Sequence, residues 1–155
     1  MIFHISLSAD DPGATADFFA RLWQGRAYPF PPFGQGSWVA MAGDERNSAI
    51  EIYPRGTEMH FGGADSSDVR EGLGAPVREQ ACHAAIASPL AVEAVLALAA
   101  EAGYPARVCD RGPFHLIEVW IDGCFMIEVL TPEMQAEYLG SMTLEGWEGF
   151  LAAAA

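Results

Sequence analysis

Two histidine–glutamate pairs occupy matching places in the two halves of the chain, and they are the residues best suited to chemistry. His4 and Glu51 are 47 positions apart, and His83 and Glu128 are 45 positions apart. Each of the four lies in a segment where apolar and polar residues alternate, which is typical of a strand with one apolar face. Successive side chains of a strand point to opposite faces, so all four are predicted to point away from the apolar face.

Imidazoles and carboxylates on the inner face of a curved sheet predict a site for one divalent metal ion. A carboxylate in such a cavity is costly to keep charged, and a cation removes this cost. The repeat of the pair favours a shared centre over four unrelated polar groups in a wet cleft. These ligand types do not discriminate sharply among metals, so zinc and nickel are expected first, with iron and manganese as alternatives. Either Glu51 or Glu128 would also serve as the catalytic base.

Three further residues are predicted to contact a small-molecule substrate. His115 belongs to the strand before that of Glu128, and a turn of two or four residues would point both side chains to one face. Trp38 holds the corresponding place in the first half, and Tyr53 follows Glu51 on the same face. The alternative for His115 is a histidine satisfied by water, and for the two aromatic residues it is a place in the core.

The elements around these residues repeat in the same order. A strand, a helix that begins after a capping residue next to proline, and a set of strands ending in a hairpin occur in each half. This order predicts an α+β fold in which two tandem βαβββ modules form a cupped, mixed barrel-like sheet with the helices outside. The expected single domain consists of module one at 1–53, an aperiodic linker at 54–80, module two at 81–131 and a helical tail at 132–155.

The composition excludes several classes of function. A formal net charge of −13 would repel nucleic acid and anionic membranes. All eight basic residues are arginine, which excludes Schiff-base catalysis and a Walker phosphate lysine. The sequence contains no apolar run of membrane-spanning length and no signal peptide pattern, so a cytoplasmic protein is expected.

Four segments resemble the vicinal oxygen chelate superfamily, which includes glyoxalase I, fosfomycin-resistance enzymes, bleomycin-resistance proteins and extradiol dioxygenases. The resemblance covers nearly the whole chain and is carried by Phe3-His4-Ile5-Ser6-Leu7, Ala49-Ile50-Glu51-Ile52, Cys82-His83-Ala84-Ala85-Ile86 and Asp122-Gly123-Cys124-Phe125-Met126-Ile127-Glu128-Val129. The last segment departs from the hairpin motif of the superfamily because Trp120 and Ile121 stand in place of an Asp-Pro pair.

The resemblance implies a glyoxalase-like metal enzyme. A set of two histidines and two glutamates is similar to the ligand set of glyoxalase I, and it implies an isomerase or lyase acting on a small oxygen-rich substrate. It also implies a homodimer, with the modules paired within one chain or swapped between subunits. Two alternatives stay open: a metal-free protein that sequesters a small ligand, as bleomycin-resistance proteins do, and an Fe(II) extradiol-type dioxygenase that uses only three of the four ligands.

Overall fold

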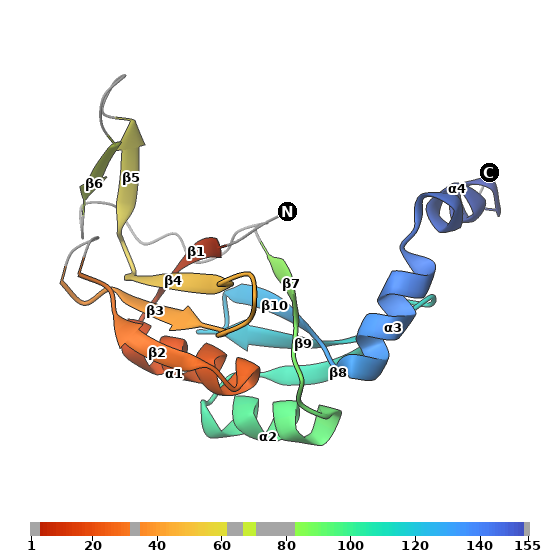
Figure 1. The fold of residues 1–155 in the computed structure, drawn as a ribbon, viewed down its shortest axis with the longest axis horizontal. Helices are drawn as coiled ribbons and strands as arrows, with labels where there is room; N and C mark the ends of the chain where they lie inside the picture. Colours follow the sequence, from red (N-terminus) through yellow and green to blue (C-terminus); the bar gives the residue numbers. More distant parts are fainter. Residues whose placement is uncertain (1–3, 32–34, 62–66, 71–82, 154–155) are drawn as a thin grey trace.

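The chain folds into two modules of the same design, one from each half (Figure 1). The computed structural model describes residues 4–31, 35–61, 67–70 and 83–153. Module one contains β1 (His4–Ala9), α1 (Pro12–Trp23), β2 (Arg26–Pro29), β3 (Trp38–Met41) and β4 (Ala49–Pro54). Module two contains β7 (Ala84–Ala87), α2 (Val92–Glu101), β8 (Ala106–Asp110), β9 (His115–Ile121) and β10 (Phe125–Leu130).

Both modules have the same sheet topology. The strand orders are β1-β4-β3-β2 and β7-β10-β9-β8, with the first strand of each module parallel to the last and the other pairs antiparallel. The predicted α+β fold of two βαβββ modules is therefore confirmed. One strand was missed: β2 lies partly in a stretch rich in proline and glycine that the sequence analysis had not assigned to a strand.

The N-terminal helix begins and ends as its sequence predicts. The Asp11 side chain accepts a hydrogen bond from the amide of Ala14 at 2.9 Å, and Pro12 occupies the first turn. Gln24 ends the helix in a left-handed conformation with φ 56°. Gly25 then lies directly against the backbone of β3, where a β-carbon would collide with the carbonyl oxygen of Met41. The lack of a side chain at this position lets the helix exit pass close to the sheet.

The two long helices pack side by side and cover one face of the sheets (Figure 1). The ring of Phe18 meets the ring of Tyr104 edge-on, with centroids 5.1 Å apart. The hydroxyl groups of Thr15 and Tyr104 are hydrogen-bonded at 2.9 Å. Phe18, Phe19 and Leu22 are buried in the core that the helices share with the strands. The sheet face opposite the helices is therefore the face left for a site.

A buried ion cluster joins the two modules where β1 and β4 end. The guanidinium of Arg55, which follows β4, forms ion pairs with Asp10 and with Asp122 in the β9–β10 loop. The Asp122 carboxylate also accepts a hydrogen bond from the Asp10 amide at 2.8 Å. Burial lowers the pKa of Arg55, but the hydrogen bond that Arg55 donates to Asp10 and the charges of the nearby carboxylates outweigh this effect and raise it. The cluster therefore stays charged and connects both modules.

The segments outside the modules have structure of their own. The predicted aperiodic linker contains a hairpin of β5 (Glu58–Phe61) and β6 (Ser67–Arg70), so part of it has regular structure. Residues 62–66 and 71–80 of this segment lie outside the described residues. After module two come α3 (Pro132–Ser141) and α4 (Leu144–Ala153). The hairpin and α4 extend from opposite ends of the molecule (Figure 1). Among the described helices, none is long and apolar enough to cross a membrane.

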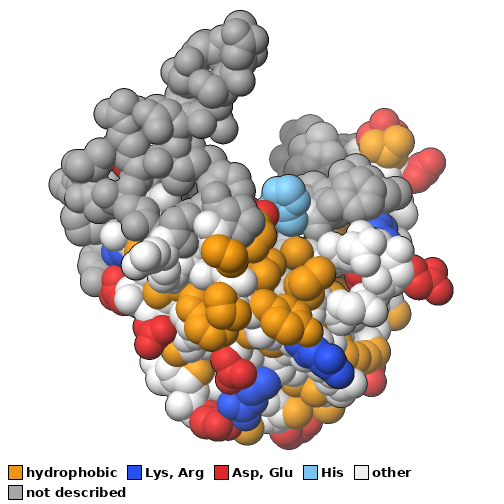
Figure 2. All heavy atoms as spheres, turned by 60° about the vertical axis from the view of Figure 1, so that its left-hand side comes forward, with side chains coloured by type: hydrophobic (Ala, Val, Ile, Leu, Met, Phe, Trp, Pro, Cys, Tyr) orange, Lys and Arg blue, Asp and Glu red, His pale blue; other side chains and the backbone are white. Residues whose placement is uncertain are grey.

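The molecular surface combines acidic and apolar areas. On the face drawn in Figure 2, hydrophobic side chains form a group that is bordered by acidic side chains, arginines and a histidine. The large apolar side chains that are exposed in the described residues are Tyr28, Met41, Val108, Leu139, Met142 and Leu144. On this face the described charged side chains therefore lie around an apolar area.

Candidate functional site

The first module presents His4 and Glu51 on the same face of its sheet. In the parallel pairing of β1 with β4, His4 is opposite Ala49 and Ser6 is opposite Glu51. The flanking residues Ile50 and Ile52 are buried on the helix side, so Glu51 points the other way. His4 is exposed at the start of β1.

Two hydroxyl groups hold the Glu51 carboxylate in place. Ser6 Oγ donates a hydrogen bond to Glu51 Oε2 at 3.2 Å, and the Tyr53 hydroxyl donates to the same oxygen at 2.5 Å. Within the described part of the chain, Glu51 Oε1 has no hydrogen-bond partner, and the residue is partly exposed. Burial, together with this bond to a carboxylate, raises the pKa of Tyr53 to about 12. Tyr53 is therefore a permanent hydrogen-bond donor at neutral pH.

The second module presents His83 and Glu128 in the same way. Glu128 is opposite Ala85 in the parallel pairing of β10 with β7, and His83 precedes Ala85 by two positions. The two side chains therefore belong to one face. Glu128 differs from Glu51 because its Oε1 lies 3.5 Å from a guanidinium nitrogen, Nη2 of Arg111.

A buried carboxylate that the sequence analysis missed lies beside Glu128. Glu118 is directly opposite Glu128 in the antiparallel pairing of β9 with β10, and its side chain is only 5% exposed. Arg107 Nε donates to one Glu118 oxygen at 2.8 Å, and Arg111 Nη2 donates to the other at 2.6 Å. The hydrogen bond from Arg107 and that from Arg111 hold the pKa of Glu118 below its usual value. The only sequence signal for this group was the alternation of Glu118 with buried apolar neighbours.

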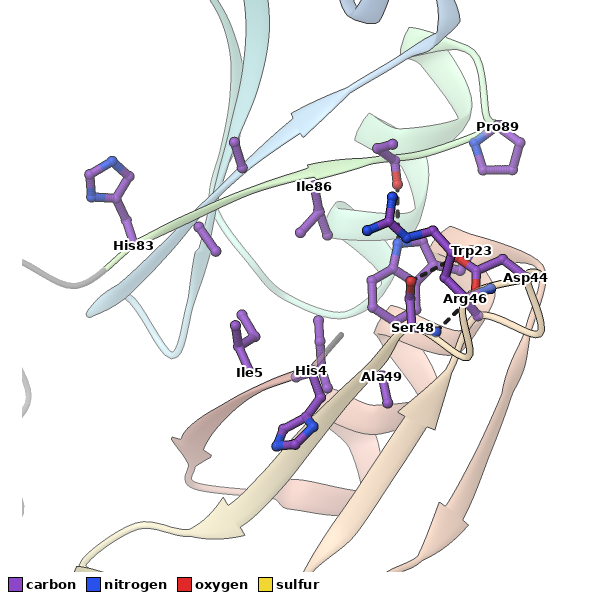
Figure 3. Close-up of a pocket in the computed structure, with 15 residues that line it drawn as sticks. His4, Ile5, Trp23, Asp44, Arg46, Ser48, Ala49, His83, Ile86 and Pro89 are labelled. Carbon is purple, nitrogen blue, oxygen red and sulfur yellow. Dashed lines mark hydrogen bonds between the residues drawn. The ribbon is translucent and has the colours of Figure 1, made fainter. Parts of the chain in front are cut away.

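The two pairs do not meet in one chain. No three histidine, cysteine or acidic side chains converge on a common point anywhere in the described residues, which include all four predicted ligands. His4 and His83 line a cavity between the modules, while Glu51 and Glu128 are not among its lining residues (Figure 3). Of the two arrangements left open by the sequence, convergence of the four ligands within one chain is therefore not observed in the described residues.

The expected orientation of His115 is wrong. Ile121 pairs with Phe125, so the loop between β9 and β10 has three residues rather than two or four. A change of one residue moves every side chain of a strand to the other face. His115 consequently lies on the face opposite Glu128, and its Nδ1 is 3.0 Å from Glu137 Oε2 of α3. This hydrogen bond raises the pKa of His115.

The two aromatic residues differ in their positions. Trp38 is opposite Ile52 in the pairing of β3 with β4, so it lies on the helix-facing side and away from Glu51. A β-carbon on Gly13 would lie 3.2 Å from its indole ring, so Trp38 packs on the first turn of α1. The structure thus favours the core alternative for Trp38. Tyr53, in contrast, contacts Glu51 directly.

Comparison with known proteins supports the fold. No family model and no curated protein sequence matches the chain. Solved structures do match. The trypanothione-dependent glyoxalase I of Leishmania major is 16% identical, with 90% of this chain and 92% of that chain covered and a TM-score of 0.53. The chain therefore has a glyoxalase-like fold.

Two further structures agree. The fosfomycin resistance protein FosX from Mesorhizobium loti is 12% identical over 88% of this chain and 95% of its own, with a TM-score of 0.54. The lactoylglutathione lyase from Agrobacterium tumefaciens is 14% identical over 83% of this chain and 91% of its own, with a TM-score of 0.53. At these sequence identities the likeness concerns the glyoxalase-like fold and does not extend to the activity.

Proposed function

We propose that this glyoxalase-like protein is a metal-dependent isomerase or lyase acting on a small oxygen-rich substrate. The observation that carries the proposal is the state of Glu51. One of its oxygens is held by Tyr53 and Ser6, the other has no hydrogen-bond partner among the described residues, and His4 belongs to the same face. A carboxylate oriented in this way is suited both to a metal and to proton transfer.

We further propose that the metal centre combines one pair from each module, His4 with Glu51 and His83 with Glu128. Since the pairs do not converge within one described chain, the combination that fits is a homodimer in which each centre takes one pair from either subunit. Zinc or nickel is expected first, with iron and manganese as alternatives. A bound divalent ion would polarise the oxygens of the substrate.

The residues of the chain itself would supply the proton chemistry. Glu51 takes a proton from a carbon next to a substrate oxygen, and the Tyr53 hydroxyl keeps the carboxylate oriented while it does so. Glu128 is the less suitable base because the guanidinium of Arg111 lies beside it. Arg111 must release Glu128 when this carboxylate binds a metal.

Metal analysis of purified variants tests the proposal. The wild type is expected to bind one zinc or nickel ion per chain, and His83→Ala and Glu128→Gln are expected to lose it. Glu93→Gln, an exposed carboxylate on α2, is the control that keeps it. A wild type that binds no metal in any preparation would refute the proposal, and oxygen uptake with catechols only on addition of iron would favour the dioxygenase.

Mixing two double variants tests where the centre forms. One carries His4→Ala with Glu51→Gln, and the other carries His83→Ala with Glu128→Gln. If subunits exchange at random and each centre is shared between them, the refolded mixture should regain about a quarter of the wild-type metal. If each centre lies within one chain, the mixture stays as empty as either variant alone.

A second candidate is a metal-free protein that binds a small ligand. It is favoured by one observation, namely that two predicted ligands, His4 and His83, line a cavity while the two carboxylates lie elsewhere. Ligand binding that is unchanged in protein treated with a chelator would support this candidate.

A further inference from the structure

A cavity lies between the modules and does not include Glu51 or Glu128 among its lining residues. It has a volume of about 760 Å³, which is in the range of sites for small molecules. The edge strands of the two sheets, β1 and β7, border it on opposite sides (Figure 3). Its wall is mainly apolar and includes Ile5, Trp23, Ile50, Ile86, Pro89 and the alanines of β7.

Trp23 forms a rigid part of this wall. Its indole Nε1 donates a hydrogen bond to the carbonyl oxygen of Ala87 at 3.1 Å, which joins the end of α1 to β7. The indole ring also lies next to the ring of Phe19, with centroids 6.2 Å apart. The polar group of the indole is thus satisfied, and the ring is available as a flat apolar surface.

The β3–β4 loop brings a positive charge to the rim of the cavity. Asp44 accepts hydrogen bonds from the amide and the hydroxyl of Ser48, at 2.9 and 2.7 Å, and these bonds lower its pKa. The Asp44 carboxylate is therefore occupied by hydrogen bonds within the loop. Arg46 lines the cavity and forms no ion pair in the described part of the chain, whereas Arg21, Arg55, Arg107 and Arg111 each do.

We propose that this cavity binds a small amphipathic anion, a monocarboxylate whose apolar body lies against Trp23 and the alanines of β7 and whose carboxylate binds Arg46. A guanidinium beside an apolar wall attracts an anion more strongly than one in open water, because the wall lowers the local dielectric constant. The apolar lining selects for a hydrophobic body. His4 and His83, two of the proposed metal ligands, also line the cavity. The proposed contacts of the anion are with Trp23, the alanines of β7 and Arg46, and none of them requires a metal.

The test uses chelator-treated protein and three matched probes that differ only in the end group. These are 4-phenylbutyrate, 4-phenylbutanol and 4-phenylbutylamine, measured by calorimetry. The carboxylate should bind about tenfold more tightly than the alcohol, and the amine more weakly than either, because a hydrogen bond to a charged group contributes more than one to a neutral group. Amide shifts in NMR spectra should appear at Ala84–Ala87 and Ser48.

Two arginine variants separate the site from the general charge of the surface. Arg46→Gln should weaken binding of the carboxylate about tenfold and leave binding of the alcohol unchanged. Arg26→Gln, an exposed arginine of β2 outside the cavity, should change neither. The proposal would be overturned if the acid and the alcohol bound equally well, or if the two arginine variants had equal effects. It would also be overturned if the amide shifts were confined to the face of Glu51 and Glu128, or if the acid did not bind at millimolar concentration.

Discussion

Removal of the Arg55 guanidinium should destabilise the whole molecule, because this side chain connects the two modules. Arg55→Met keeps an apolar side chain of similar length and deletes the charge. Its effect depends on the burial of the two partners: the side chain of Arg55 is 7% exposed, that of Asp122 14% and that of Asp10 45%. In Arg55→Met the buried carboxylate of Asp122 therefore loses its counterion with little access to water, whereas the half-exposed carboxylate of Asp10 can be hydrated.

The magnitude follows from this difference. Breaking a buried ion pair by removing one partner costs about 3–5 kcal/mol. The ion pair between Arg55 and the half-exposed Asp10 contributes about 0–1 kcal/mol, as a surface ion pair does. Since Asp122 keeps its hydrogen bond from the Asp10 amide, the lower end applies, about 3 kcal/mol of the free energy of unfolding. For a chain of this length, such a loss lowers the melting temperature by roughly 6–12 °C.

Urea unfolding followed by circular dichroism and tryptophan fluorescence measures this effect. Arg21→Met is the matched control, since it breaks an exposed ion pair with Glu101 and should change the free energy of unfolding much less than Arg55→Met does. Asp122→Asn supplies the third variant for a double-mutant cycle, because asparagine tolerates the left-handed φ of 51° at this position. If Arg55→Met costs no more than Arg21→Met, or if the cycle shows no coupling with Asp122, the cluster does not hold the modules together.

Three further predictions concern single contacts. The NMR pKa of His115 should lie above 6.5 and fall toward that value in Glu137→Gln. The pair stabilises the fold fully between about pH 4.5 and pH 6.5. Its contribution is lost as pH rises through the raised pKa of His115 and as pH falls through the lowered pKa of Glu137. Gly25→Ala should cost about 2–3 kcal/mol, measured by urea unfolding, because its β-carbon would meet a backbone carbonyl that cannot move aside. In an alkaline absorbance titration, Tyr53 should ionise near pH 12, and Glu51→Gln should lower that value.

Each of these predictions has a direct counter-result. A His115 pKa that does not respond to Glu137→Gln would mean that the hydrogen bond is not formed in solution. Gly140→Ala serves as the control for Gly25→Ala because its β-carbon has open space in α3, so it should be neutral or stabilising. A Tyr53 hydroxyl that ionises near 10 would contradict the contact with Glu51.

Local sequence patterns were enough to assign the face of each predicted ligand. The alternation around Glu51 and Glu128 places both away from the buried isoleucine and valine residues on either side, and the pairing registers agree. The face of each residue could be predicted because the alternation of side chains along a strand depends only on the backbone of that strand. The caps of α1 at Asp11 and Pro12 were predictable for the same reason.

Relations between strands were harder to predict. His115 was placed on the wrong face because the β9–β10 loop has three residues, with Asp122 and Gly123 both at positive φ. The sequence allows more than one loop length here, and a difference of one residue reverses the result. Glu118 was missed because its partners Arg107 and Arg111 lie on a different strand and its following turn.

The amino-acid sequence by itself thus determined the two βαβββ modules, the start of α1 and the faces that carry the His–Glu pairs, because periodicity and capping act over a few neighbouring residues. The predicted start of α2 at the capping residue next to proline was wrong, because this helix begins at Val92 after Ala91, which forms no side-chain cap. Only the tertiary structure decided which of these faces meet. The Arg55 cluster, the packing of α1 on α2 and the cavity beside Arg46 depend on the angle between the modules. That angle is set by contacts between residues far apart in the chain, which no local pattern encodes.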